Sequence, residues 1–265
     1  MRNWVPMGVL LVLLTGCPQT SFDISQAKII DLTYPFDSDT VYWPTEEDFT
    51  LQETFKGMTE GGYFYASNKF RAPEHGGTHL DAPIHFSKGK RSVDQIPIEQ
   101  LIGPGFVVDV SQKSLKNPDS QIFVEDLLEW EKTHGQIPRG AILLLKTGYG
   151  KFWPDRKKYM GTNERGKQAL SQLHFPGLHP GAARWLIQNR DIKAVGIDTP
   201  SIDFGQTKNF LTHQILFGAN IPAIENVANL DKLPYQGFNL IALPMKIAGG
   251  SGAPTRIIAI LPKTP

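Results

Sequence analysis

Short runs of apolar and β-branched residues recur along the chain, and each has the length of a strand. They predict strands over residues 28–32, 63–72, 105–110, 141–146, 193–197, 239–243 and 256–261. Apolar residues at helical spacing predict helices over residues 123–134, 180–189 and 207–217. Strands therefore outnumber helices and are mixed with them, which predicts an α/β or α+β domain.

The N-terminal end has a different pattern. Arg2 is followed by an apolar run over residues 9–14, which is too short to span a bilayer and is typical of a signal-peptide core. The run ends in Leu14-Thr-Gly-Cys17, which resembles the bacterial lipobox, and Cys17 is the only cysteine in the chain. We therefore expect lipid on Cys17. The alternative is an ordinary signal peptide or a short membrane anchor with an incidental cysteine.

This interpretation divides the chain into a lipoprotein-type signal peptide (1–17), a short tether (18–26) and one domain (27–265), because no linker or repeat interrupts the remainder. We expect the protein to be exported and held by lipid on the bacterial cell envelope. With 27 Lys and Arg residues and 26 Asp and Glu residues, the net charge is only +1, which argues against a general nucleic-acid binder. A single cysteine excludes an intrachain disulfide framework and a cysteine-rich zinc site.

Three of the seven histidines lie in one short segment, where His75, His79, Asp81 and His85 have the spacing His-x3-His-x-Asp-x3-His. Two imidazoles and a carboxylate are a common ligand set for a catalytic divalent metal, and zinc and manganese both suit it. Glycines and a proline within the segment disfavour a continuous helix. The ligands would then converge from a strand end, a tight loop and a following helical turn, which Asp81 would cap. The alternative is that each histidine is structural and has its own partner.

The same segment resembles the HxGTHxDAPxHF signature of the cyclase family, which includes bacterial kynurenine formamidases and isatin hydrolases. The resemblance continues in family order almost to the end of the chain, through residues 146–148, 195–203, 213, 224–226 and 242–256. It implies an α/β swivelling β/β/α fold, with a mixed sheet core and flanking helices. It also implies a metal-dependent hydrolase that forms a homodimer or a higher homo-oligomer.

The resemblance implies one or two metal ions per chain. His75, His79 and Asp81 correspond to the family's ligands for the first metal. His213 and Glu225 correspond to ligands for a second metal, with Asp81 shared between the two positions. On its own, His213 would be an ordinary core histidine and Glu225 an ordinary loop carboxylate.

The resemblance also implies roles around the metal. His85 corresponds to the catalytic histidine, and Trp43 to an aromatic residue that contacts the substrate in the formamidases. One departure lies beside Trp43: the formamidases continue Gly-Asp after Trp-Pro, whereas Thr45 and Glu46 follow here. Because that loop helps to line the substrate pocket, the identity of the substrate stays open.

The reaction follows from the ligand set. A divalent metal polarises a carbonyl group and lowers the pKa of a bound water. We expect His85, with a pKa near neutrality, to act as general acid and base for the water and the leaving nitrogen. The leading prediction is an arylformamidase-like hydrolase of a small aryl amide or formamide. The alternatives are isatin hydrolase-like opening of a cyclic amide or lactone, or a catalytically silent metal-binding lipoprotein.

Overall fold

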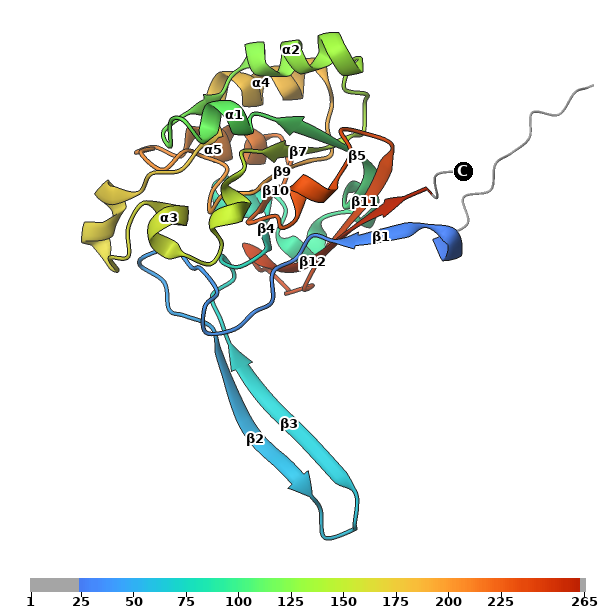
Figure 1. Cartoon of the computed structure of the whole chain (residues 1–265), viewed down its shortest axis with the longest axis vertical. Helices are drawn as coiled ribbons and strands as arrows, with labels where there is room; N and C mark the ends of the chain where they lie inside the picture. The colour runs from blue at the N-terminus through green and yellow to red at the C-terminus, as the bar shows by residue number, and fades with distance from the viewer. Residues whose placement is uncertain (1–23, 263–265) are drawn as a thin grey trace, which may run out of the picture.

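The computed structural model describes residues 24–262, in which a closed mixed sheet has helices along one side and a long hairpin projecting from the other (Figure 1). The strands are β1 (Lys28–Asp31), β2 (Thr50–Met58), β3 (Phe64–Arg71), β4 (His79–Asp81), β5 (Ile102–Asp109), β6 (Gln121–Ile122), β7 (Ile142–Lys146), β8 (Gly177–Leu178), β9 (Ala194–Ile197), β10 (Ala223–Glu225), β11 (Phe238–Pro244) and β12 (Gly252–Leu261). The α-helices are α1 (Ser111–Ser114), α2 (Val124–His134), α3 (Arg156–Met160), α4 (Pro180–Asn189) and α5 (Leu211–Gly218).

Eight of these strands form one sheet in the order β1-β12-β11-β5-β7-β9-β10-β4. Strand β4 also pairs with β12, and this second pairing closes the sheet into a barrel-like core. Strands β5, β7, β9 and β10 run parallel to one another, whereas β4, β11, β12 and β1 pair antiparallel. The prediction of an α/β fold with a mixed sheet and flanking helices is therefore confirmed.

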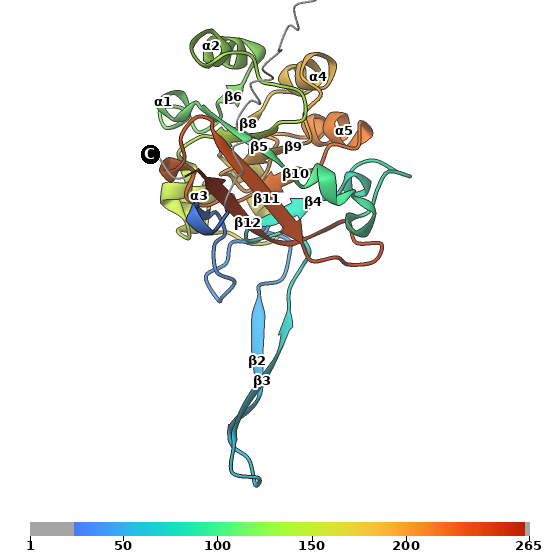
Figure 2. The same ribbon diagram turned by 90° about the vertical axis from the view of Figure 1, so that its right-hand side faces the viewer.

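Strand β7 shows why the barrel strands are continuous apolar runs. Ile142, Leu143, Leu144 and Leu145 are all fully buried, because each face of the sheet is covered. Ile142 and Leu144 point into the barrel interior. Leu143 and Leu145 point outward into a second apolar layer, which helices α2, α4 and α5 cover (Figure 2).

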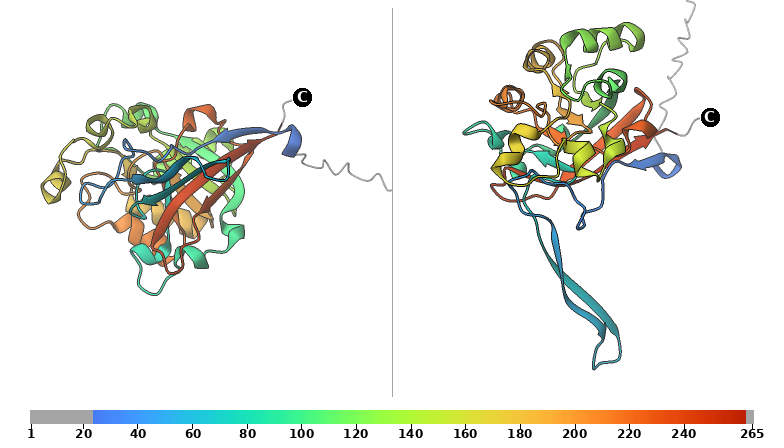
Figure 3. Two further views of the ribbon diagram at one scale, coloured as in Figure 1. Left: turned by 90° about the horizontal axis from the view of Figure 1, so that it is seen from below. Right: turned by 60° about the vertical axis from the view of Figure 1, so that its left-hand side comes forward.

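Strands β2 and β3 form a separate antiparallel hairpin, which we call the arm. The arm extends well away from the barrel, as Figure 1 and the right-hand view of Figure 3 show. Almost all of its side chains are exposed, including several aromatic ones. The arm is inserted between the segment that holds Trp43 and the loop that holds His75.

The elements predicted from the sequence are present, with shifts at their ends. The third helix begins at Leu211 rather than near residue 207, because Phe210 adopts a left-handed backbone with a φ of 49°. Ile24–Gln26, the end of the expected tether, form a single 3-10 turn. Cys17 and the expected signal peptide lie outside the described residues. No helix among residues 24–262 combines the length and the apolar character that crossing a membrane requires.

Candidate metal centre

The register of strand β4 brings together the first candidate ligands. His79 and Asp81 are two residues apart on β4, so they share one face of the sheet, while Leu80 between them is buried in the barrel interior. Strand β10 places Glu225 directly opposite His79. Cross-strand partners share a face, so the Glu225 carboxylate lies beside the His79 ring, with Oε2 at 3.5 Å from Nε2.

His213 reaches the same point from helix α5. Its Nε2 lies 3.2 Å from Oδ2 of Asp81 and 3.3 Å from Oε1 of Glu225. On the other side of the ring, Nδ1 lies 2.6 Å from Oδ2 of Asp203, which also accepts the backbone N–H of His213. Asp203 accepts the N–H of Thr212 as well, so this carboxylate fixes both the start of α5 and the orientation of the ring.

His75 occupies the open side of the site. Its Nδ1 lies 2.7 Å from Oδ1 of Asp81, and its Nε2 lies 2.9 Å from the hydroxyl oxygen of Ser251. Ser251 donates its own hydroxyl hydrogen to the carboxylate of Glu74, 2.5 Å away, so it accepts from His75. Nε2 of His75 therefore carries a hydrogen, and Nδ1 is the ring nitrogen that would be available to a metal ion beside Asp81.

The same reasoning applies to His79. Its Nδ1 lies 2.9 Å from the carbonyl oxygen of Gly77, which can only accept, so Nδ1 carries a hydrogen and Nε2 faces Oδ1 of Asp81 at 3.1 Å. Gly77 adopts a left-handed backbone with a φ of 57°, and a Cβ there would lie 2.6 Å from the Phe36 ring, so the loop needs glycine.

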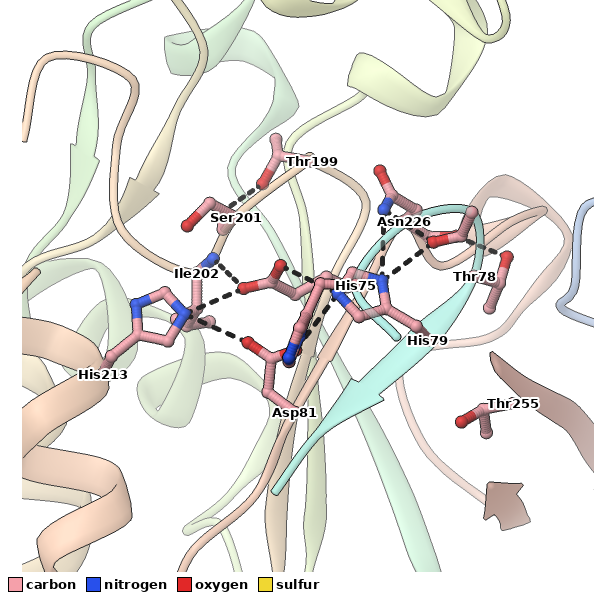
Figure 4. A network of polar contacts seen from close by, with 12 residues as sticks. His75, Thr78, His79, Asp81, Thr199, Ser201, Ile202, His213, Asn226 and Thr255 are labelled. Atoms are coloured by element: carbon pink, nitrogen blue, oxygen red, sulfur yellow. Dashed lines mark hydrogen bonds and ion pairs between the residues drawn. The ribbon is translucent and has the colours of Figure 1, made fainter. Parts of the chain in front are cut away.

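The ring nitrogens of His75, His79 and His213 therefore converge on the carboxylate of Asp81 (Figure 4). Those of His79 and His213 also approach the carboxylate of Glu225. Without a metal, protons on the imidazoles offset the charges of these carboxylates, and a divalent cation bound between them would take the place of those protons. The residues thus fit a divalent metal ion bound by nitrogen and oxygen, for which zinc and manganese are both suitable.

The pKa values of the buried groups reflect this crowding. Burial raises the pKa of Glu225, and the neighbouring charge of Asp81 raises it further. Burial alone would also raise the pKa of Asp81, but His75, His79 and His213 hold it well below its usual range. Burial alone would lower the pKa of His213, yet its hydrogen bonds to Asp203, Asp81 and Glu225 raise it well above the usual value.

The donor atoms fall into two groups, each within 4.8 Å: His75 with Asp81 and His85, and His79 with Asp81 and Glu225. Asp81 belongs to both groups, as the resemblance implies for a shared ligand. The resemblance places His75 and His79 with Asp81, whereas in the structure His85 takes the place of His79 in the group of His75. The ring of His85 stacks on that of His75 with a centroid separation of 3.8 Å.

Two expectations for this segment are wrong. Asp81 does not cap the helical turn Pro83–His85, whose N-cap is Ala82 without a side-chain hydrogen bond. The pKa of His85 is not near neutrality: burial lowers it to about 4, and the charges of nearby histidines add to the effect. His85 is therefore uncharged at neutral pH.

The donor groups lie at one end of a cavity of about 210 Å³. Apolar and aromatic side chains form most of its remaining wall, namely Val41, Tyr42, Trp43, Phe86, Pro200 and Phe210. Trp43 lies edge-on to the rings of Phe175 and Phe210, each with a centroid separation of 6.3 Å. The cavity therefore brings together His75, His79, Asp81, His85, His213, Glu225 and Trp43, all of which were predicted from the sequence.

Several residues of this site were not singled out from the sequence. Asp203, Ser251 and Glu74 orient the candidate ligands, and Glu46 lines the cavity. The only sequence signal for Asp203 and Ser251 is their place in stretches that resemble the cyclase family.

The three other histidines lie outside this cavity. His134 bonds to the Trp130 carbonyl group, His174 to Asp119, and His179 caps helix α4. They therefore have structural partners of their own.

Comparison with known proteins agrees with this geometry. A sequence model of the Cyclase family matches residues 30–204, which is more than half of the chain. The chain belongs to the Cyclase family. The resemblance seen in the sequence is therefore confirmed, and the donor set lies on a cyclase fold.

Two kinds of cyclase-family relative stand out. The chain is 33% identical over 210 residues to isatin hydrolase of Roseibium aggregatum, which covers 76% of this chain and 77% of the relative. It is also 27% identical over 234 residues to kynurenine formamidase of Bacillus cereus, and this match covers 86% of this chain and 95% of the relative. A solved structure, isatin hydrolase A from Labrenzia aggregata bound to benzyl benzoate, superposes with a TM-score of 0.80 at 32% identity, covering 90% of this chain and 95% of that one.

Proposed function

We propose that this protein is a metal-dependent hydrolase that cleaves a carbon–nitrogen bond in a small aryl amide or formamide. The observation that carries the proposal is the convergence of histidine ring nitrogens on Asp81 and Glu225 in the wall of a cavity that is otherwise lined largely by apolar and aromatic side chains. Relatives named isatin hydrolase and kynurenine formamidase support the reaction class.

The chain's own residues divide the work. His79, Asp81 and Glu225, with His75 and His213, would hold one or two zinc or manganese ions. A divalent metal bound there supplies polarisation of the substrate carbonyl group and a lower pKa for water.

His85 is uncharged at neutral pH, because its pKa is about 4, and it lines the cavity beside the donor groups. It is therefore in the right protonation state to accept the proton of the attacking water. It then returns that proton to the leaving nitrogen, which completes general acid and base catalysis. Trp43, Phe86 and Phe210 offer flat faces against which an aryl ring packs.

Hydrolysis assays test the proposal and separate its alternatives. The purified protein is treated with a chelator and then loaded with zinc or manganese, and N-formylkynurenine and isatin are each offered. Metal-dependent release of formate supports the arylformamidase-like activity. Ring-opening of isatin without formamide hydrolysis supports the isatin hydrolase-like alternative. Stoichiometric metal without either activity leaves a silent metal-binding lipoprotein and contradicts the proposal.

We also propose that the protein is exported and anchored through lipid on Cys17. The apolar run before Cys17 and the lipobox-like Leu14-Thr-Gly-Cys17 support this. Metabolic labelling with a radioactive fatty acid, followed by membrane fractionation, tests it. Cys17→Ser should lose both label and membrane association, whereas a labelled serine variant would refute the assignment.

We further propose that two copies associate through their arms to form a homodimer. Phe55, Tyr65 and Phe70 are exposed on the arm, as are Leu51, Met58, Tyr63 and Phe64. An isolated two-stranded hairpin is only marginally stable in water, and a contiguous apolar surface of this kind marks an interface. Light scattering of the intact protein should give a dimer, and replacing residues 51–70 with a short glycine turn should give a monomer. A monomeric intact protein would refute the arrangement.

A further inference from the structure

Apart from the histidines, the charged residues that line the cavity are all acidic. Its described lining residues include no lysine or arginine. Apart from the candidate ligands Asp81 and Glu225, the only acidic residue among them is Glu46. Apart from the candidate ligands, the described lining of the cavity therefore combines aromatic side chains with a single carboxylate.

Glu46 differs from its two acidic neighbours in having no cationic partner. Glu47 pairs with Arg71 at 2.8 Å, and Asp48 pairs with Arg165 at 3.0 Å. Among the described residues, no lysine, arginine or histidine nitrogen forms an ion pair with the Glu46 carboxylate. Of these three consecutive acidic residues, two pair with arginines, and the third, Glu46, is the one that lines the cavity.

Hydrogen bonds hold the backbone around Glu46 in place, although its carboxylate has no ion-pair partner among the described residues. The N–H of Glu46 donates to the Trp43 carbonyl oxygen at 3.0 Å, and the N–H of Gly166 donates to that of Pro44 at 2.8 Å. Arg165 also donates to the Glu46 carbonyl oxygen. The carboxylate is therefore kept on the same tight turn as the indole of Trp43.

A carboxylate beside aromatic faces is the chemistry that recognises an organic ammonium group. The carboxylate accepts charge-assisted hydrogen bonds, and the aromatic faces attract the cation. An anionic substituent would meet the Glu46 charge with no lysine or arginine of the lining to offset it.

We propose that Glu46 is a specificity-determining residue that selects aryl amides bearing an ammonium group away from the scissile bond. This inference rests on the proposed hydrolase function, which it deepens by naming the substrate class. The Glu46 side chain is exposed, so the contribution of the ion pair is modest, about 3- to 10-fold in kcat/KM.

Three formanilides of similar size test the inference: one with an aminomethyl group, one with a methyl group and one with a carboxymethyl group. The metal-loaded intact protein should prefer the first over the second, and the second over the third. Glu46→Gln should lower the ratio of kcat/KM for the first two substrates by about 3- to 10-fold. Glu47→Gln, whose residue pairs with Arg71, is the matched control and should keep the ratio. The wild-type preference should also weaken as salt is added.

Glu46→Gln with an unchanged ratio, or Glu47→Gln with an equal loss, would overturn the inference while the hydrolase function stands. If none of the formanilides is hydrolysed, the proposed function fails, and a binding measurement then tests the role of Glu46. Benzylammonium should then bind the metal-loaded wild type more tightly than Glu46→Gln in calorimetry, whereas benzyl alcohol should not distinguish them. Equal benzylammonium affinities would refute the subsite.

Discussion

Replacement of Asp203 by asparagine tests how the second candidate metal position is built. Asp203 and His213 are both almost completely buried, and 2.6 Å separates Oδ2 from Nδ1. Burial would raise the pKa of Asp203, but the hydrogen bond and charge of His213 lower it, so the carboxylate is ionised. Asparagine has nearly the same shape and keeps one acceptor oxygen, but it removes the negative charge from behind the His213 ring.

The expected loss of metal affinity follows from the position of the Asp203 carboxylate, which bonds to the candidate ligand His213 on the side of the ring away from the metal position. Loss of such a partner typically weakens metal binding by about 10–100-fold, which corresponds to about 1.4–2.8 kcal/mol. Because the Asp203–His213 contact is short and shielded from water, we expect a value in the upper half of that range. The start of helix α5 also loses part of its acceptor, which costs about 1 kcal/mol of stability in the metal-free protein.

Metal affinity is measured by competition with a chromophoric chelator, and stability by thermal unfolding of the metal-free protein. Asp119→Asn is the matched control, because Asp119 bonds to His174 at 2.8 Å at a partly exposed position outside the cavity. Asp203→Asn should bind metal about 10–100-fold more weakly, and Asp119→Asn should bind like the wild type. Wild-type affinity in a folded Asp203→Asn protein would refute the role of His213 as an oriented ligand.

Three further substitutions test the rest of the centre. Asp81→Ala removes the carboxylate that both donor groups share, so metal content by mass spectrometry and activity should fall together; full metal content would rule out the shared ligand. His85→Ala should keep its metal while kcat falls by about 10²–10⁴-fold, and loss of metal would instead make His85 a ligand. Because burial lowers the pKa of His85, the acid limb that disappears from the pH–rate profile in His85→Ala should lie below pH 6.5; metal content is measured at each pH, because protonation of the ligand histidines also releases metal. Gly252→Ala places a Cβ 2.5 Å from Cε1 of His75 and should weaken metal binding, whereas Gly218→Ala meets no atom within 4 Å and should not.

The candidate ligands His79 and Asp81 could be predicted from the local sequence because they lie close together along the chain. His79 and Asp81 are two residues apart, and a strand places such residues on the same face. His213 and Glu225 lie more than 130 residues away from this strand, and only the pairing of β10 with β4 and the position of α5 bring them near. Nothing local distinguishes them, so their prediction depended on the family resemblance.

The arm shows where pattern-based prediction fails. Strand β3 lies within the run of residues 63–72 that was predicted as a strand. Strand β2 was not predicted, because most of its residues are polar or charged and none of its side chains is buried. The pKa of His85 was misjudged for a related reason. Spacing along the chain does not reveal the burial and ring stacking that act on a side chain.

Closure of the barrel by β4 has a consequence for biosynthesis. Strand β4 lies near the beginning of the chain, but both of its partners, β10 and β12, lie near the end. While the chain is being made, β4 has two unpaired edges, and the donor set lacks Glu225 until almost the whole chain has emerged. The complete donor set therefore forms only late in synthesis. If the chain is exported, as we propose, and crosses the membrane unfolded, the complete donor set forms only on the far side of the membrane, and the metal supply of that compartment would determine which ion is loaded.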